Sequence, residues 1–500
     1  MLNQPDITNT FLLRAALIGT LFLVACSTNN SSNNSSNNGN SSQDPAYTTG
    51  GTVSRLVGAG LVLQNNGGNN LTVSANGSFN FTTGLATGAA YSVTVLTQPS
   101  NPTQVCTVTN GSGAVASAAI TNVAVNCLTT TTSAMVPDFG NNRVLIYTVP
   151  LGAVFDETAS TVLGQPGFTT ATAGTTASTM NQPTAVAVDA KGNVYVVDSA
   201  NCRVTQFVSP ITSGMNASVV FGQPNFTTST CPASTSATSA TSLYGPYGAT
   251  VDHAGDLWVD DYESSRIVEY VPPFSNGMSA ALAIGQPNLT SGSATQATTS
   301  AALSLPGFPI FDPSGNLWVA DYNNSRVLEY KPPFSTGMPA SLVLGQGNFT
   351  NNSEAVGATG MDGPWAVAFD ASGNLWMADY DNNRVLEFVP PFTNDMAATL
   401  VLGQPDFVHN SSNDGFTTPT AATLSNPLQV AFSSNGDLWV NDSGNNRTLV
   451  FAPPFTNGMN ATDVIGQPSF SADLPNQGLT APTSATQNNP QGVITGPPLY

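Results

Sequence analysis

The chain has 500 residues and a net charge of −19, yet only 8% of its residues are charged. A nucleic-acid-binding surface requires clustered Lys and Arg, and this chain has ten of them in total. The composition therefore argues against nucleic acid, and against anionic membrane surfaces, as partners of the folded part. The length predicts about two to four domains.

The first residues predict export. Arg14 precedes an apolar stretch, residues 15–25, which has the length of a secretory hydrophobic region and is too short to span a bilayer. The stretch ends in Leu-Val-Ala-Cys and resembles the lipobox of bacterial lipoproteins. The resemblance implies a signal peptide over residues 1–25, lipidation of Cys26 and a lipid anchor in the bacterial cell envelope, with Ser27 favouring the outer membrane or cell surface. An ordinary cleaved signal followed by a chance cysteine is the alternative.

Two segments separate the signal from the repeats. Residues 26–49 are rich in Ser and Asn and predict a flexible tether. Residues 50–128 contain short β-rich runs with Asn-Gly and Gly-Gly turns, which predicts a small antiparallel β-sandwich of about five to seven strands. This unit is similar to sandwich modules of bacterial surface lipoproteins, which implies a spacer.

Four further cysteines, an even number in an exported chain, predict two disulfides. The expected pairs are Cys106 with Cys127 and Cys202 with Cys231.

Six copies of one pattern fill the rest of the chain, each with an Asp five residues before an Arg. Six of the ten basic residues therefore sit at one repeat position. The copies are spaced by 58–63 residues, and a fixed period of this kind indicates a repeat architecture. The pairs are Asp138 and Arg143, Asp198 and Arg203, Asp261 and Arg266, Asp321 and Arg326, Asp379 and Arg384, and Asp442 and Arg447.

Each copy predicts four strands joined by turns, and four-stranded antiparallel units of this kind build β-propeller blades. The frame runs from a Pro-led apolar segment through a Gly-Asn turn and Leu-Trp to the Asp and Arg, and it resembles the NHL repeat. That resemblance implies a propeller of usually six blades. The close matches are residues 184–207, 247–270, 308–330, 364–388 and 428–451.

The two ends of the repeat region complete each other. The segment from Ser133 begins at the position of a second strand, and the segment from Asn488 reads as a first strand with no second strand after it. Five complete copies and one split copy predict an all-β, six-bladed propeller over residues 133–500, closed by its N- and C-terminal strands. Closure removes two exposed sheet edges.

Residues that recur in every copy are expected to serve the scaffold. The Asp–Arg pairs span the turn between the second and third strands, where they can pair and bond backbone groups. The alternative is a ring of charges that binds an ion or ligand. The aromatic residue three positions before the Asp is expected to pack between blades, and the Gln that follows the fourth strand is expected to bond neighbouring backbone.

Positions that vary between copies predict a ligand face. In a propeller, the loops between blades and the turns after the second strands emerge on one face, and several variable positions there carry aromatic residues. They are expected to stack on sugars or peptides, and the alternative is that they pack under the long loops. The candidates are Phe139, Thr184, Tyr247, Tyr262, Tyr322, Trp365, Tyr380 and Leu428.

Catalytic patterns are scarce. His253 and His409, the two histidines, fall in loops expected on opposite faces, and no Gly-x-Ser-x-Gly nucleophile motif occurs. We assign no catalytic residue, no metal ligand and no cofactor. Gluconolactonase-like propellers resemble this chain and use acidic ligands, which leaves Ca²⁺ at the Asp260–Asp261 doublet as an open alternative.

The sequence thus predicts a non-enzymatic, envelope-anchored binding or scaffold protein that contacts protein or glycan partners. The alternative is a metal-dependent propeller enzyme of the lyase or lactonase type with a divalent cation in its channel. A purely structural surface protein is a third interpretation.

Overall fold

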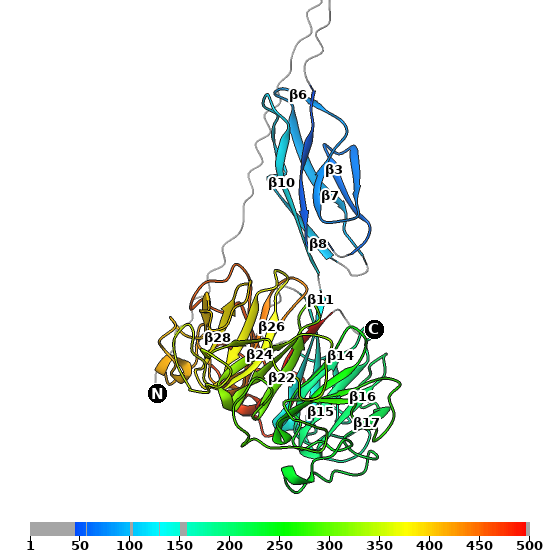
Figure 1. Ribbon diagram of the computed structural model, residues 1–500. Helices are drawn as coiled ribbons and strands as arrows, with labels where there is room; N and C mark the ends of the chain where they lie inside the picture. Colours follow the sequence, from blue (N-terminus) through cyan, green and yellow to red (C-terminus); the bar gives the residue numbers. More distant parts are fainter. Residues whose placement is uncertain (1–45, 57, 101–103, 130, 151–157, 497–500) are drawn as a thin grey trace, which may run out of the picture. The chain divides into compact units, whose positions relative to one another are not determined.

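The computed structural model describes residues 46–56, 58–100, 104–129, 131–150 and 158–496 (Figure 1). The expected signal peptide and Cys26, and most of the expected tether, lie outside the described residues. No described residue belongs to a helix long and apolar enough to cross a membrane.

The first folded unit is a β-sandwich. It contains two four-stranded sheets, ordered β5-β2-β10-β8 and β4-β3-β7-β9, and a short β1–β6 pair. Its own core includes Leu61, Phe79 and Val125. The strands are β1 (Ala46–Tyr47), β2 (Thr49–Ser54), β3 (Leu61–Asn65), β4 (Asn69–Val73), β5 (Gly77–Asn80), β6 (Leu85–Ala86), β7 (Ala90–Thr97), β8 (Gln104–Thr109), β9 (Ser112–Ala114) and β10 (Ile120–Thr129).

The sandwich differs from the expectation in three ways. It starts at residue 46, inside the expected tether, and its two sheets hold eight strands. It is also not wholly antiparallel, because β2 and β10 pair in parallel. Hydrophobic alternation specifies which face of a strand is buried but not which distant strand it pairs with, so this pairing left no local signal. The Cys106–Cys127 disulfide joins β8 to β10 at directly paired positions.

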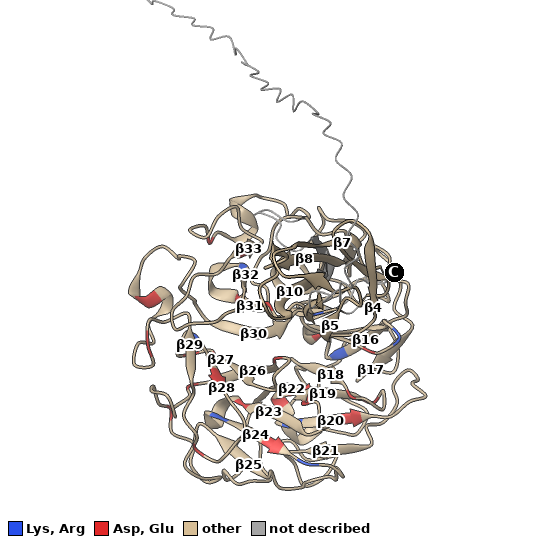
Figure 2. Ribbon diagram, turned by 90° about the horizontal axis from the view of Figure 1, so that it is seen from above, with Lys and Arg blue, Asp and Glu red and all other residues tan. Residues whose placement is uncertain are grey.

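Five consecutive copies of the repeat each form one four-stranded antiparallel sheet, here called blades 1 to 5. Seen from above, the first strands β18, β22, β26 and β30 lie near the centre, and the last strands β21, β25, β29 and β33 lie at the rim (Figure 2). The blades are β14 (Pro183–Val188) to β17 (Val219–Phe221), β18 (Ala249–Val251) to β21 (Leu282–Ile284), β22 (Pro306–Phe311) to β25 (Leu342–Leu344), β26 (Pro364–Phe369) to β29 (Leu400–Leu402) and β30 (Pro427–Phe432) to β33 (Asp463–Ile465).

Their middle strands are equally regular. The second strands are β15 (Val194–Asp198), β19 (Leu257–Asp261), β23 (Leu317–Asp321), β27 (Leu375–Asp379) and β31 (Leu438–Asp442). The third strands are β16 (Arg203–Phe207), β20 (Arg266–Tyr270), β24 (Arg326–Tyr330), β28 (Arg384–Phe388) and β32 (Arg447–Phe451).

A sixth sheet is assembled from both ends of the region. β34 (Ile494–Gly496) pairs with β11 (Thr131–Asp138), followed by β12 (Arg143–Pro150) and β13 (Thr161–Leu163). We call this sheet blade 6. Its second strand comes from the start of the repeat region and its first strand from the end.

Aromatic rings fill the spaces between blades. Trp258 on β19 is fully buried, and its ring packs against Phe311 and Phe334 of blade 3 at 5.5 and 5.1 Å. Trp318 and Trp376 repeat this arrangement against the blades that follow them. The Phe of each Pro-Pro-Phe turn is therefore a packing residue for the preceding blade.

Every Asp–Arg pair is a buried ion pair that also binds the loops. In blade 3, the Arg326 Nε atom donates to Asp321 at 2.7 Å, Nη1 donates to the carbonyl of Phe349, and Nη2 donates to the carbonyls of Thr299 and Ala302. Asp321 in turn accepts the backbone N–H of Ser304. The pair thus fastens the loop before the blade and the loop after it.

The same contacts recur around the ring. All six Arg–Asp distances are 2.6–2.7 Å, and the side chains are at most 1% exposed. The recurring Gln adds a second clamp: Gln346 donates to the carbonyl of Ser325 in the turn and to that of Ser353 in the loop. The Cys202–Cys231 disulfide provides a third, joining the turn after β15 to the loop that follows β17.

We expect Asp321→Asn to destabilise the propeller by about 3–5 kcal/mol, because it leaves the buried Arg326 charge without a counter-charge. The measurement is the midpoint of thermal unfolding of the full chain. Lys331→Met is the control, since Lys331 is 60% exposed and lies 3.5 Å from Glu329, and its loss is expected to cost less than about 1 kcal/mol. Equal effects of the two variants would contradict a structural role for the buried pair.

Candidate functional site

The propeller has two unlike ends. One end, the loop face, carries the long loops between blades and the turns between second and third strands. The other end, the turn face, carries the remaining connections within each blade. The candidate residues from the sequence fall on the loop face, and the structure has separate features of interest at both ends.

An aromatic cluster lies on the loop face. Trp365, 7% exposed at the start of β26, is surrounded by four half-buried tyrosines. Its ring centroid lies 5.5 Å from that of Tyr247, 5.7 Å from Tyr262, 5.0 Å from Tyr322 and 5.6 Å from Tyr380. Five of the eight residues expected to form a ligand face are therefore in contact, contributed by blades 2, 3 and 4.

The other three candidates behave differently. Leu428 belongs to the same hydrophobic cluster as Trp365 but is buried. Thr184 is fully buried, and its hydroxyl has no hydrogen-bond partner among the described residues. Phe139 is half-buried in the turn after β11, and its ring is not among the described rings that contact Trp365. These three do not extend the aromatic surface.

Carboxylates border the cluster. The Tyr322 hydroxyl donates to Asp381 at 3.1 Å. Gly363 makes room for this contact, because a side chain there would collide with both residues and its φ of 58° favours glycine. Desolvation, together with Asp381 and Glu354, raises the pKa of Asp362 to about 6. The rim is therefore rich in negative charge.

Asp260 and Asp261, which the sequence offered together as possible Ca²⁺ ligands, lie in different environments. Asp261 is committed to the Arg266 ion pair. Asp260 itself is fully buried, no described side chain donates a hydrogen bond to its carboxyl, and the backbone of Gly248 is its one hydrogen-bonding neighbour. Burial and the nearby Asp261 raise its pKa well above the ordinary value. Its charge acts on the hydroxyls of Tyr247 and Tyr262, so it lies close to the aromatic cluster.

The central channel is lined by apolar side chains together with two threonines and one glutamine. A cavity of about 240 Å³ is lined by first-strand residues of all six blades, including Val188, Val251, Ile310, Phe369 and Phe432. Its lining contains no carboxylate and no histidine. Because Ca²⁺ requires several oxygen ligands, these residues do not fit the channel-bound cation considered from the sequence.

The turn face holds a larger cavity of about 930 Å³, lined by residues of blades 1, 2 and 3. Tyr195, Phe274 and Phe311 supply apolar walls, and His253 and Lys191 supply polar ones. His409 lies in the loop after blade 4, where it pairs with Asp406. The two histidines are thus on different faces.

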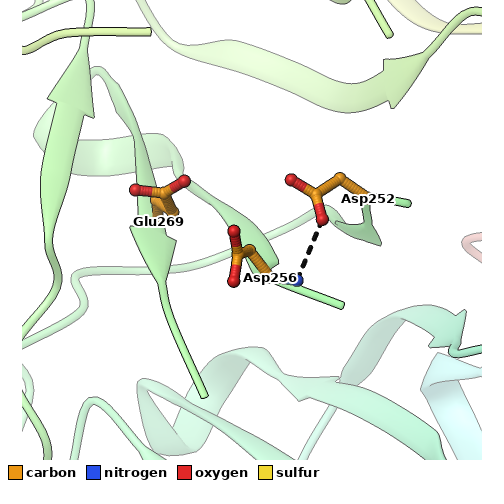
Figure 3. A group of neighbouring side chains, drawn as sticks. All are labelled: Asp252, Asp256 and Glu269. Atoms are coloured by element: carbon orange, nitrogen blue, oxygen red, sulfur yellow. Dashed lines mark hydrogen bonds between the residues drawn. The ribbon is translucent and has the colours of Figure 1, made fainter. Parts of the chain in front are cut away.

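Three carboxylates gather beside this cavity. Asp252, which lines it, has oxygen atoms within 4.8 Å of those of Asp256 and Glu269 (Figure 3). Desolvation, then Asp256 and Asp252, raises the pKa of Glu269 to about 7. Carboxylates at this spacing offer oxygen ligands to a divalent cation.

The equivalent positions in other blades have different residues and hydrogen bonds. Where blade 2 has Asp256, blades 1, 3 and 4 have an Asn whose amide donates to the preceding Asp, at 2.7–2.8 Å. Where blade 2 has Ala281, blades 3 and 4 have Ser341 and Thr399, whose hydroxyls donate to the Glu of the third strand. Compared with blades 3 and 4, blade 2 therefore lacks two hydrogen-bond donors and carries one more negative charge. Alignment of the six copies at these positions would have detected both changes.

Residues 180–207, which contain β14 to β16, match the NHL repeat family model. The repeat region is an NHL-type β-propeller, as the sequence pattern predicted, and the chain is all-β in the residues described.

Solved structures with a similar fold include bacterial enzymes. The periplasmic gluconolactonase of Pseudomonas aeruginosa is 14% identical, with a TM-score of 0.44 over 74% of this chain and 100% of that one. A putative 6-phosphogluconolactonase from Bacteroides uniformis is 12% identical, with a TM-score of 0.41 over 73% of this chain and 99% of that one. Virginiamycin B lyase from Staphylococcus aureus is 15% identical, with a TM-score of 0.34 over 65% and 82%. No curated protein matches the sequence.

We expect Asp256→Asn to stabilise the NHL-type propeller by about 1 kcal/mol at neutral pH, because the new amide can donate to Asp252 as in the neighbouring blades. The raised pKa of Glu269 means that the folded state binds a proton more readily than the unfolded state. That contribution favours folding at low pH and is lost as the pH rises to about 7.

The measurement is the thermal midpoint of both proteins across this pH range. The parent is expected to lose stability as the pH rises from about 4.5 to about 7, and the variant to lose less. Ala281→Ser, which restores the second donor without changing the charge, is the companion variant. A variant less stable than the parent at neutral pH would contradict the interpretation of the three acids as mutually repelling.

Proposed function

We propose that this chain is a binding protein of the bacterial envelope, carried by a lipid on Cys26, that contacts a protein or glycan partner through the loop face of its propeller. The observation that carries the proposal is the aromatic cluster around Trp365. Its four tyrosines have large, mostly apolar rings, yet each of them is only half-buried. Partly exposed tyrosines grouped on a rigid scaffold supply contact area at little conformational cost.

The scaffold supports this role. The turns that carry Tyr262, Tyr322 and Tyr380 are held by the Asp–Arg pairs and by the recurring Gln, so the rings have fixed positions before a partner arrives. Preorganisation of this kind lowers the entropic cost of binding.

Site-specific photo-crosslinking tests the proposal. A photoreactive residue at Glu263, exposed on the loop face, is expected to give a crosslinked adduct when the full chain is mixed with envelope extract from its own organism. The same residue at His253, exposed on the turn face, is the control and is expected to give none. Mass spectrometry of the adduct separates a protein from a glycan. Adducts at His253 alone, at both positions equally, or at neither would overturn the proposal.

A metal-dependent propeller enzyme is the second candidate, and one specific observation favours it. Asp252, Asp256 and Glu269 gather beside the 930 Å³ cavity, which has the size of a small-molecule site. This candidate predicts one Ca²⁺ bound per chain in calorimetric titration of the parent, and none for Asp256→Asn. Absence of binding to the parent, or binding that Asp256→Asn leaves unchanged, would contradict it.

A further inference from the structure

The aromatic cluster on the loop face has many negative neighbours. Glu263 and Asp381 are exposed beside Tyr262 and Tyr380, and Asp362 lies near Asp381. Carboxylates dominate the charged groups that act on the four tyrosine hydroxyls. A surface of aromatic rings bordered by carboxylates attracts cations through both the ring quadrupoles and the formal charges.

The described residues supply no free Lys or Arg to this surface. Of its ten basic residues, six are the buried Arg of the ion pairs. Lys191 and Lys331 lie on the turn face, in the connections after β14 and β24, and Arg55 follows β2 of the sandwich. Arg14, the tenth, precedes the described residues. The loop-face acids therefore lack an internal Lys or Arg partner among the described residues.

Asp260 is an independent observation in favour of a cationic ligand. A buried carboxyl with no side-chain donor and no counter-charge is costly, so the fold keeps a group here that its own packing does not require. Asp260 and Trp258 project from the same side of β19, since side chains alternate along a strand, and Trp258 packs on Phe311 of blade 3. Asp260 thus faces β22, one of the strands that frame the aromatic cluster.

We infer that the aromatic cluster and its carboxylates bind a basic side chain, a Lys ammonium or an Arg guanidinium, presented by a partner protein. This inference rests on the proposed function and names the chemistry of the partner. Tyr247, Tyr262, Tyr322 and Tyr380 provide the ring faces, and Asp381 and Glu263 pair with the charge at the rim. Asp260 lies beneath, and a bound cation favours the charged form of its buried carboxyl.

The exposure of the rings favours a side chain over a sugar. A sugar ring stacks on a broad open aromatic face, and Trp365, the largest ring, is only 7% exposed. A charged head group on a flexible stem needs only the exposed part of a tyrosine face. The net charge of −19 also steers a basic protein toward this chain from a distance.

Calorimetric titration of the full chain tests the inference. The probes are a tri-lysine peptide, a tri-arginine peptide and the same lysine peptide with acetylated side chains, each at low and at high ionic strength. The two basic peptides are expected to bind at low ionic strength and to weaken as salt is added, and the acetylated peptide is expected not to bind. Binding of all three alike, or of none, would overturn the inference.

Variants locate the binding. Tyr262→Leu removes a ring and is expected to weaken peptide binding by about threefold, whereas Tyr262→Phe keeps the ring and is expected to leave it unchanged. Asp260→Asn is expected to weaken binding by about three- to tenfold while raising the thermal midpoint, because it removes an unpaired buried carboxyl. Asp395→Asn, an exposed acid on the turn face, is the charge-matched control and is expected to have no effect. Equal losses for Asp260→Asn and Asp395→Asn would indicate nonspecific attraction and overturn the inference.

Two further outcomes are distinguishable. If tetramethylammonium binds as well as the peptides, the site recognises a free small cation and the partner protein is excluded. If the partner crosslinked at Glu263 is unaffected by Asp260→Asn, by Tyr262→Leu and by salt, the loop face remains the contact surface but its recognition is not cationic. Capture of a neutral glycan at Glu263 would likewise keep the loop face as the contact surface and overturn cationic recognition.

Discussion

The buried Asp–Arg pair is the interaction on which the propeller depends. Each Arg satisfies its own Asp and three backbone carbonyls from two different loops, so a single side chain closes a blade and anchors the connections on either side of it. Only a planar guanidinium with several fixed donors can do this. The long loops between blades are rich in Ser and Thr and have few apolar residues that could pack. The hydrogen bonds from the Arg hold these loops in place instead.

This division of labour has a consequence for charge. Six of the ten basic residues of the chain are used inside the blades, where each charge is cancelled by an Asp. The exposed charge is therefore mostly negative. The negative charge is most concentrated where acidic side chains have no hydrogen-bond donor beside them. The loop-face rim and the blade 2 cluster are two such places, and they lie at opposite ends of the propeller.

The predictable parts of this protein are the local ones. Asp and Arg five residues apart across a tight turn must meet, so that contact follows from spacing alone. In most copies the Arg also donates hydrogen bonds to carbonyls 23–27 residues away. These acceptors cannot be identified from the sequence, because every residue has a carbonyl. The parallel pairing of β2 and β10 is hidden for a similar reason. The aromatic cluster was foreseen as a surface, but the burial of Trp365 beneath its tyrosines depends on distances between blades that no single repeat encodes.

The sheet of blade 6 is built from both ends of the repeat region, so it cannot be completed until the last strand has been made. β34 pairs with β11, and Asp138 forms a bridge with Pro490, so this blade is completed by residues more than 350 positions apart. A chain synthesised from its N-terminus presents β11 to β13 long before β34 is made. Until then the edge of β11 is open, and an open edge is a template for pairing with another chain. Folding of this protein thus depends on its last strand: until β34 is in place, the early blades must be kept from pairing with other chains.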